Sequence, residues 1–287
     1  MELTIQQQLR YKEILIRTLK AFDAFCTENN LRYYATGGTA IGAIRHKGII
    51  PWDDDIDVAM IREDYDRFLS LKNKLIGTPY KIIDPSNKGY YLPFAKFIDT
   101  NTTLWETPCY EYLIGVFIDI FPLNHVDNDM VAIKKYQKEY LDVCWKYLGG
   151  FMYSSFSNAL AIKSPAKIKG WIKYILLNRY YANIFWKHEE QLKASKGDFL
   201  LNYYTQYKME KELFKKEWFK DQIRVPFEDT EINLMSGYKE FLTQMFGDYM
   251  TPPPVEQQVS HHTHYFIDLE RGLSLKEVKR IIKSKQI

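Results

Sequence analysis

Residues 51–60 read PWDDDIDVAM, and this stretch decides the fold. Four aspartates crowd together and run directly into an apolar segment, Ile56–Met60, which we expect to be a strand. Alternate residues of a strand point to the same face, so Asp55 and Asp57 should lie together while the residues beside them face the core. Neighbouring carboxylates repel each other unless a divalent cation lies between them. A solvated acidic turn is the alternative, but it does not account for the alternating Asp57.

The segment before the aspartates, TGGTAIGAIRHK, has the layout of a phosphate-binding turn. Gly37 and Gly38 let the backbone approach a phosphate closely, and a short helix expected over Thr39–His46 offers N–H groups at Thr39 to an anion. The helix ends in a basic triplet, Arg45, His46 and Lys47. The triplet suits a substrate that carries phosphate. It is equally explained as a solvated helix end, where cations are also favoured.

A third acid stands in the strand-like run GVFIDIFPL, residues 115–123. Asp119 is flanked by isoleucines, in a position where an unpaired buried charge is costly. Together with Asp55 and Asp57 it would complete a metal site. Asp119→Ala would then abolish turnover and raise the thermal stability by relieving repulsion between the carboxylates. An ion pair between Asp119 and a lysine or arginine is the alternative.

The composition is that of a globular protein of 287 residues, with 46% hydrophobic and 26% charged residues. A net charge of +3 is too small to predict nucleic-acid binding. Cys26, Cys109 and Cys144 have no CxxC spacing, so we expect neither a disulfide framework nor a zinc knuckle. There is no signal-peptide pattern and no apolar run of about 18 residues, so we expect a cytoplasmic location.

Hydrophobic periodicity predicts an α/β (α+β) protein in which helices flank a mixed sheet. Residues 1–128 begin with a helical pattern, in which the apolar residues Leu15, Leu19, Phe22 and Cys26 recur and which stops near Glu28. Short β-rich runs follow, and we assign residues 1–128 to the catalytic core. Residues 129–221 are mainly helical, basic and aromatic, and we interpret them as an insertion or subdomain. Residues 222–287 are expected to complete the catalytic domain, and their run YKEFLTQMFGDYM predicts a helix that ends at Gly247.

Within the helical part, residues 164–187 read SPAKIKGWIKYILLNRYYANIFWK and mix basic with aromatic residues. On a helix, one apolar face would be formed by Ile168, Trp171, Ile172 and Ile175, with lysines at 167, 169 and 173 to its sides. Such a helix can lie on an anionic membrane surface. An ordinary core-packing helix with solvated lysines is the more common arrangement and stays the alternative.

Two further candidates rest on less specific patterns. HHTHYF supplies His261, His262 and His264, of which His262 could contact phosphate or transfer a proton. A zinc site and plain packing are the alternatives for these histidines. Lys96, in FAKFI, could reach a nucleotide, although a single lysine on a strand is usually solvated.

Three blocks of the sequence resemble those of one known family. Residues 37–68, GGTAIGAIRHKGIIPWDDDIDVAMIREDYDRF, resemble the signature block of the LicD family of phosphorylcholine transferases and fukutin-type ribitol-phosphate transferases. GVFIDIFPL resembles the second block, and residues 238–262, YKEFLTQMFGDYMTPPPVEQQVSHH, resemble the third. Asn124 stands where many members carry an acid, and residues 129–221 match no motif.

The resemblance implies a nucleotidyltransferase-like fold, a divalent metal (Mg²⁺ or Mn²⁺) and a CDP-linked donor. Its phospho-alcohol, expected to be phosphorylcholine, would pass to a sugar hydroxyl of a cell-surface glycan precursor with release of CMP. Lipopolysaccharide, teichoic acid and capsule are the glycans concerned, and a lipid-linked acceptor would bring the enzyme to the inner membrane face. Matched position by position, the acids of the site are Asp55, Asp57 and Asp119. The glycine pair and the basic triplet match as well.

Two other functions stay open. One is a nucleotidyltransferase that attaches NMP to a small molecule and releases pyrophosphate instead of CMP. The other is a non-catalytic nucleotide-binding protein, although a retired site has no reason to keep costly buried acids. The transferred alcohol is not specified by the sequence, because choline needs an aromatic cage and aromatic residues such as Trp52, Trp105 and Tyr110 are abundant.

Overall fold

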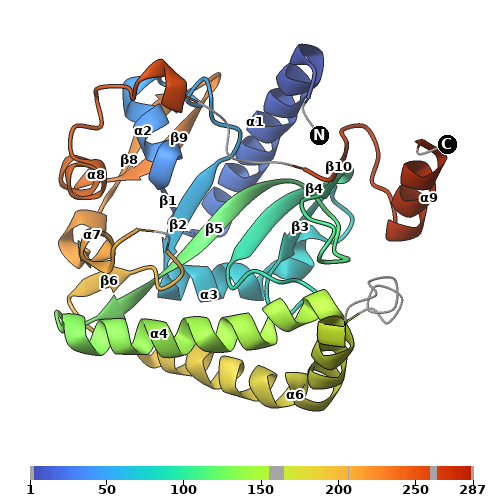
Figure 1. Cartoon of the computed structure of the whole chain (residues 1–287). Coiled ribbons are helices and arrows are strands. Elements are labelled where there is room, and N and C mark those ends of the chain that lie inside the picture. Colours follow the sequence, from blue (N-terminus) through green and yellow to red (C-terminus); the bar gives the residue numbers. More distant parts are fainter. Residues whose placement is uncertain (1–2, 155–164, 206, 259–263, 286–287) are drawn as a thin grey trace.

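The computed structural model describes residues 3–154, 165–205, 207–258 and 264–285. Figure 1 shows helices arranged around a mixed sheet, so the predicted α/β class is confirmed. The main path of the sheet runs in the order β1-β2-β5-β4-β10. Its strands are β1 (Tyr34–Ala35), β2 (Asp57–Ile61), β5 (Ile114–Val126), β4 (Ala95–Trp105) and β10 (Phe266–Asp268). Strand β3 (Tyr80–Ile83) pairs with β4.

Helix α1 (Ile5–Glu28) packs against strands β4 and β5. It begins after Thr4, which forms a capping box with Gln7. The predicted apolar face of this helix is buried, and the ring of Phe22 lies 5.7 Å from that of Phe97 on β4. Because side chains alternate along a strand, the neighbouring Lys96 points to the opposite face of the sheet. One face of the sheet is therefore apolar, and the other can carry polar side chains.

Two elements of the first block begin slightly away from their predicted positions. Helix α2 (Gly37–Arg45) starts two residues before Thr39, because Gly37 adopts φ +56° and turns the chain into the helix there. Strand β2 begins at Asp57 rather than Ile56. Asp55 therefore precedes the strand, and simple alternation does not fix its direction. The N–H of Asp57 donates to Thr39 Oγ1 and the Asp57 carbonyl accepts from the Thr36 N–H, so the paired segment begins at Asp57.

The helical part of the chain forms a layer beside the sheet, as Figure 1 shows. Helix α4 (Met130–Tyr147), the 3₁₀ helix η2 (Gly149–Tyr153) and helix α6 (Pro165–Ala194) pack together around an apolar cluster of their own. The chain then returns to the sheet, because β6 (Phe199–Leu201) pairs with β5. The remaining elements of this part are α7 (Met209–Glu212), β7 (Phe214–Lys215) and η3 (Lys216–Phe219).

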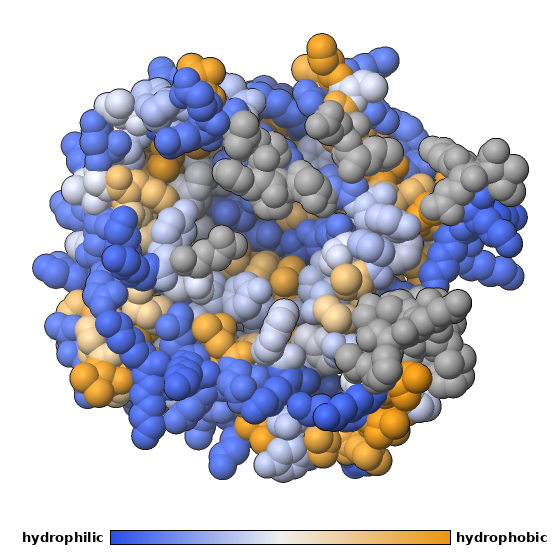
Figure 2. All heavy atoms as spheres, in the orientation of Figure 1, coloured by the Kyte–Doolittle hydropathy of each residue, from blue (hydrophilic) through white to orange (hydrophobic). Residues whose placement is uncertain are grey.

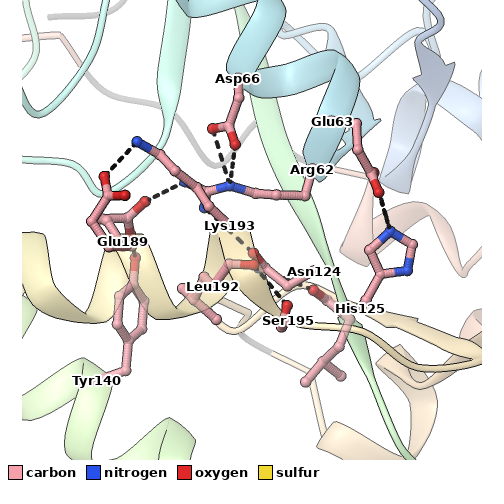
Figure 3. A network of polar contacts seen from close by, with 12 residues as sticks. Arg62, Glu63, Asp66, Asn124, His125, Tyr140, Glu189, Leu192, Lys193 and Ser195 are labelled. Atoms are coloured by element: carbon pink, nitrogen blue, oxygen red, sulfur yellow. Dashed lines mark hydrogen bonds and ion pairs between the residues drawn. The ribbon is translucent and has the colours of Figure 1, made fainter.

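A buried polar network joins the helical layer to the sheet (Figure 3). Arg62 opens helix α3 (Arg62–Ser70) and is 2% exposed. Its guanidinium lies 2.9 Å from Glu189 of α6 and 3.1 Å from Asp66, and donates to the Asn124 side chain of β5 at 3.4 Å. Tyr140 of α4 donates to the other oxygen of Glu189. Two acids, Asp66 and Glu189, therefore balance the buried charge of Arg62.

The C-terminal part packs against α2 through β8 (Gln222–Phe227) and against β1 through β9 (Thr230–Met235). The hairpin of these two strands is followed by α8 (Tyr238–Phe246), which ends at Gly247 as the sequence predicts. The 3₁₀ helix η4 (Val255–Gln257) precedes β10, and α9 (Leu275–Lys285) closes the chain. Among the described residues, no helix combines the length and the apolar character that crossing a membrane requires.

Candidate active site

The predicted acids meet a lysine in one row across the sheet. In the parallel pair of β2 and β5, Asp57 is the register partner of Asp119. In the antiparallel pair of β5 and β4, Asp119 is the register partner of Lys96. Register partners point to the same face, so Asp57, Asp119 and Lys96 lie side by side on the face away from α1. We call these three residues the charged row. In Figure 2 this side of the molecule is hollowed over the sheet, with hydrophilic residues at the bottom of the hollow.

Lys96 is buried in the row rather than solvated. Its Nζ lies 2.8 Å from Asp119 Oδ1 and 3.6 Å from Glu106 Oε1, and it sits 3.4 Å from the centre of the Phe117 ring. The lysine side chain is 2% exposed. Burial alone would lower the pKa of Lys96, but Asp119 and Glu106 outweigh it and raise that pKa, so the lysine stays charged. Asp119 thus has the ion pair that the sequence left as the alternative, and its role as a metal ligand stays a prediction.

Asp57 is held against the start of α2. Its backbone N–H donates to Thr39 Oγ1 at 2.8 Å, and its carbonyl accepts from the Thr36 N–H at 3.1 Å. Burial raises the pKa of Asp57 well above its usual range, and the charges of Asp55, Asp119 and Asp53 raise it further. The repulsion expected from the sequence is therefore present. This repulsion acts on Asp57, whose backbone is held in place by Thr39 in the first turn of α2.

The two glycines make room for the acids. A Cβ atom on Gly37 would lie 3.4 Å from Asp57 Oδ2, and one on Gly38 would lie 2.4 Å from Asp53 Oδ2. Any larger residue at Gly38 would displace the carboxylate of Asp53. The pair lets carboxylates approach the positive end of a helix, where negative charge is stabilised. Contact between these glycines and a phosphate stays a prediction, as does substrate binding by Thr39, whose hydroxyl already bonds Asp57.

The basic triplet is tied to the C-terminal part of the chain. Arg45 Nη1 donates to the carbonyl of Tyr249 at 2.8 Å, and its guanidinium lies 5.9 Å from the Trp52 ring centre. The His46 ring meets the same indole edge-on at 5.9 Å. The carbonyl of Lys47 accepts from the Glu228 N–H in the β8–β9 hairpin at 2.7 Å. The bond from Arg45 to Tyr249 joins the first and third blocks, and a phosphate contact by the triplet stays a prediction.

The residues of the charged row and Asp55 fit the predicted divalent metal only in part. In the described residues, no group of three or more His, Cys, Asp or Glu side chains is arranged to hold a metal ion. Magnesium, however, is usually bound through one or two carboxylates together with waters and substrate phosphates. Asp55 and Asp57, whose charges act on each other, fit that mode. The acids therefore suit a cation that arrives with a phosphate-bearing ligand rather than a closed three-carboxylate site.

The structure also adds residues that the sequence analysis missed, and it leaves one prediction outside its range. Glu106 follows β4 directly and approaches Lys96, and Tyr91 donates to Glu106 Oε2 at 2.6 Å. The sequence did contain one sign of this contact, since Glu106 directly follows the strand-like run that carries Lys96. His262 lies outside the described residues.

A mixed sheet with acids in register on two parallel strands, beside a helix that starts at a glycine pair, defines a nucleotidyltransferase-like domain. The family model described as "LicD/FKTN/FKRP, nucleotidyltransferase domain" matches residues 30–159. The chain is 31% identical to "Lipopolysaccharide cholinephosphotransferase LicD" of Haemophilus influenzae, over 91% of this chain and 97% of that protein. The chain belongs to the LicD family. An uncharacterized protein of Rickettsia typhi is 29% identical over 43% of this chain and 38% of its own length.

Proposed function

We propose that this protein is a transferase that moves phosphocholine from CDP-choline to a sugar hydroxyl of a cell-surface glycan and releases CMP. The Haemophilus relative, whose name describes a lipopolysaccharide cholinephosphotransferase, supports the reaction because its similarity spans nearly the whole of both chains. The observation that carries the proposal is the charged row beside the start of α2. It gathers acids and one lysine where a diphosphate and a hydroxyl can meet.

The proposal includes a divalent cation, Mg²⁺ or Mn²⁺. Asp55 and Asp57 would hold it, with Asp119 as a third ligand or a neighbour. When bound, the cation neutralises charge that develops on the phosphates as the diphosphate bond breaks. Because the charges of Asp55, Asp119 and Asp53 raise the pKa of Asp57, a nearby cation also relieves repulsion that the protein alone leaves in place.

The remaining roles are assigned to side chains of the row and of α2. An ionised Asp119 can accept the proton of the attacking sugar hydroxyl, with Lys96 compensating its charge 2.8 Å away. The N–H groups at the start of α2 and the basic triplet at its end are proposed to contact the donor phosphates. The bond from Arg45 to the Tyr249 carbonyl fixes the place of that guanidinium at the end of α2, which supports the proposal.

A lipid-linked acceptor would require the enzyme to reach a membrane surface, and α6 supports such a contact. In the predicted apolar face of this helix, Ile168, Ile172 and Ile175 are 47%, 48% and 56% exposed, whereas Trp171 is half-buried. The neighbouring Leu176 is 70% exposed. Core packing therefore does not describe the three isoleucines. Lys169 and Lys173 are exposed beside them. We propose peripheral contact with an anionic inner membrane face through this helix.

A donor panel tests the function. Purified protein is incubated with CDP-choline, CDP-ribitol, CDP-glycerol or CDP-ethanolamine, deacylated lipopolysaccharide and Mg²⁺ or Mn²⁺, and nucleotide release is measured by chromatography. We expect CMP to appear fastest from CDP-choline and to disappear with a chelator. Pyrophosphate released from CTP would identify a nucleotidyltransferase instead. If none of the donors is turned over with either metal, the protein is a non-catalytic nucleotide-binding protein.

A further inference from the structure

An aromatic cavity of about 620 Å³ opens beside the charged row. It lies between α4, η2 and the segments at the two ends of β4, and its volume is typical of a site for a small ligand. Its walls include the aromatic residues Tyr91, Tyr110, Trp145 and Tyr204. The rings of Tyr91 and Tyr110 are stacked, with centres 4.0 Å apart and planes 6° from parallel. These residues come from separate segments of the chain, so the fold assembles the aromatic wall.

The charges of this cavity favour a cation. No lysine, arginine or histidine is among the described residues that line it, whereas Asp142 is one of them. Asp142 also pairs with Lys146 at 2.5 Å. By contrast, a cavity of about 830 Å³ at the C-terminal end of β5 has more basic than acidic residues in its lining: Arg32, Lys215, Lys216 and Lys220 against Glu63, Asp198 and Glu217. An anion would be drawn to that second cavity, and a cation to the aromatic one.

Two chains of contacts connect the aromatic cavity to the charged row. Tyr91 donates to Glu106, which lies 3.6 Å from Lys96, the partner of Asp119. Donation to a carboxylate makes the Tyr91 ring more electron-rich, which strengthens its attraction for a cation. On the other wall, the Tyr204 ring lies 5.5 Å from that of Phe94, and Phe94 lies 5.7 Å from Lys96 Nζ. The cavity is thus one or two side chains from the proposed reaction centre.

We infer that the aromatic cavity binds the quaternary ammonium group of the choline that the donor carries. Aromatic faces attract such a cation, which is weakly hydrated and cannot donate hydrogen bonds. The inference rests on the proposed phosphocholine transfer and adds to it the residues that select choline. Ribitol and glycerol carry no positive charge, so the cavity would discriminate against both.

Binding of the isolated group tests the cavity without relying on activity. Choline is titrated by calorimetry into the wild-type protein, in parallel with 3,3-dimethyl-1-butanol, its uncharged isostere. We expect choline to bind and the isostere to bind at least about tenfold more weakly. Trp145→Leu and Tyr204→Leu should weaken choline binding about tenfold, while Trp145→Phe and Tyr204→Phe should retain most of it. Both side chains are partly exposed, at 74% and 39%, so their replacement leaves folding intact.

Kinetics separate a failure of the cavity from a failure of the proposed function. The leucine variants should raise KM for CDP-choline about tenfold with kcat little changed, because they remove ground-state binding. Choline binding without any turnover of CDP-choline would keep the cavity assignment and reject the reaction. Turnover of CDP-choline with unchanged KM in both leucine variants would keep the reaction and reject the cavity. Equal affinity for choline and its isostere would also reject it.

Discussion

The sheet and the helical layer place their charges in opposite ways. On the sheet, Lys96 and Asp119 are buried and paired in strand register. On α6, Lys169 and Lys173 are exposed, and so are the isoleucines beside them. A charge that has been removed from water must be fixed beside its partner, whereas an exposed charge needs no fixed partner. We infer that the sheet carries the chemistry and that the helical layer carries contacts with the alcohol and the membrane.

The strongest test of the sheet side is Asp57→Asn. It removes a formal charge at nearly constant volume, and we expect at least about a 100-fold loss of CMP release at saturating Mg²⁺. Asp55→Asn should behave similarly. The exposed Asp127→Asn is the matched control and should be fully active. Near-normal activity of both site variants would show that these acids do not form the metal site.

The same variant has a pH-dependent effect on stability. The pKa of Asp57 is raised in the folded protein, so the folded state keeps a proton that the unfolded state loses. The wild-type protein therefore loses stability as the pH rises above 3.8, the ordinary pKa of aspartate, towards the raised pKa. Without metal at pH 8, Asp57→Asn should melt at a higher temperature than the wild-type protein. A lower melting temperature would mean that the charge is compensated in the fold.

The ion pair reverses the expectation for Asp119. From the sequence alone, Asp119→Ala should raise stability by relieving repulsion. Because it leaves Lys96 buried without its nearest anion, we now expect it to lower the free energy of unfolding by about 3–5 kcal/mol, measured by urea denaturation. Lys96→Met combined with Asp119→Leu should restore much of that loss. If Asp119→Ala is more stable than the wild-type protein, repulsion between the carboxylates outweighs the ion pair with Lys96.

Glu212 extends the comparison, because it is a buried acid whose carboxylate is bonded by the Thr205 hydroxyl rather than paired with a lysine in the part of the chain that the structure describes. Burial raises its pKa to about 7, and Thr205 donates to it at 2.6 Å. The folded state therefore holds a proton that the unfolded state releases near pH 4.5, and stability falls as the pH rises from 4.5 to 7. Glu212→Gln should remove this fall, a gain of about 2–3 kcal/mol at pH 8 relative to pH 4.5. If the free energy of unfolding changes with pH in the same way in the wild-type protein and in Glu212→Gln, the prediction is wrong.

The smallest expected effect belongs to α6. Wild-type protein should co-sediment with anionic liposomes at low salt and release them at high salt. Lys169→Glu with Lys173→Glu should weaken this binding on the order of tenfold without altering the melting temperature. The control is Lys81→Glu with Lys88→Glu, which makes the same change in net charge on exposed residues away from α6 and should bind the liposomes like the wild-type protein. If the wild-type protein stays in the supernatant at low salt, α6 is not a membrane surface.

Local patterns predicted the elements well. The α/β class, the helix that ends at Glu28, the helix that ends before Gly247 and the helical stretch after Asp129 are confirmed. Capping residues, glycines and periodicity act within a few neighbouring positions, so they are legible in the sequence. The start of β2 was displaced by one residue, since bonding from Thr39 and Thr36 begins the strand at Asp57.

The composition of the site was less accessible to sequence analysis. The acids stand in recognisable blocks, but nothing local shows that Lys96 lies in register with Asp119, because register depends on how distant strands align. The exposed face of α6 was equally ambiguous, since an amphipathic pattern looks the same whether the helix packs on a core or faces outward. The aromatic cavity depends on several segments meeting and has no sequence motif.

The charged row has a consequence for how activity arises during folding. Its members come from positions 57, 96 and 119 and meet only when three strands have aligned. Parallel pairing between distant segments forms slowly, because loop closure costs entropy before any contact forms. A nascent or partly folded chain therefore contains the acids but cannot bring them together. Under the proposed function, turnover of the donor should therefore begin only after these three strands have aligned.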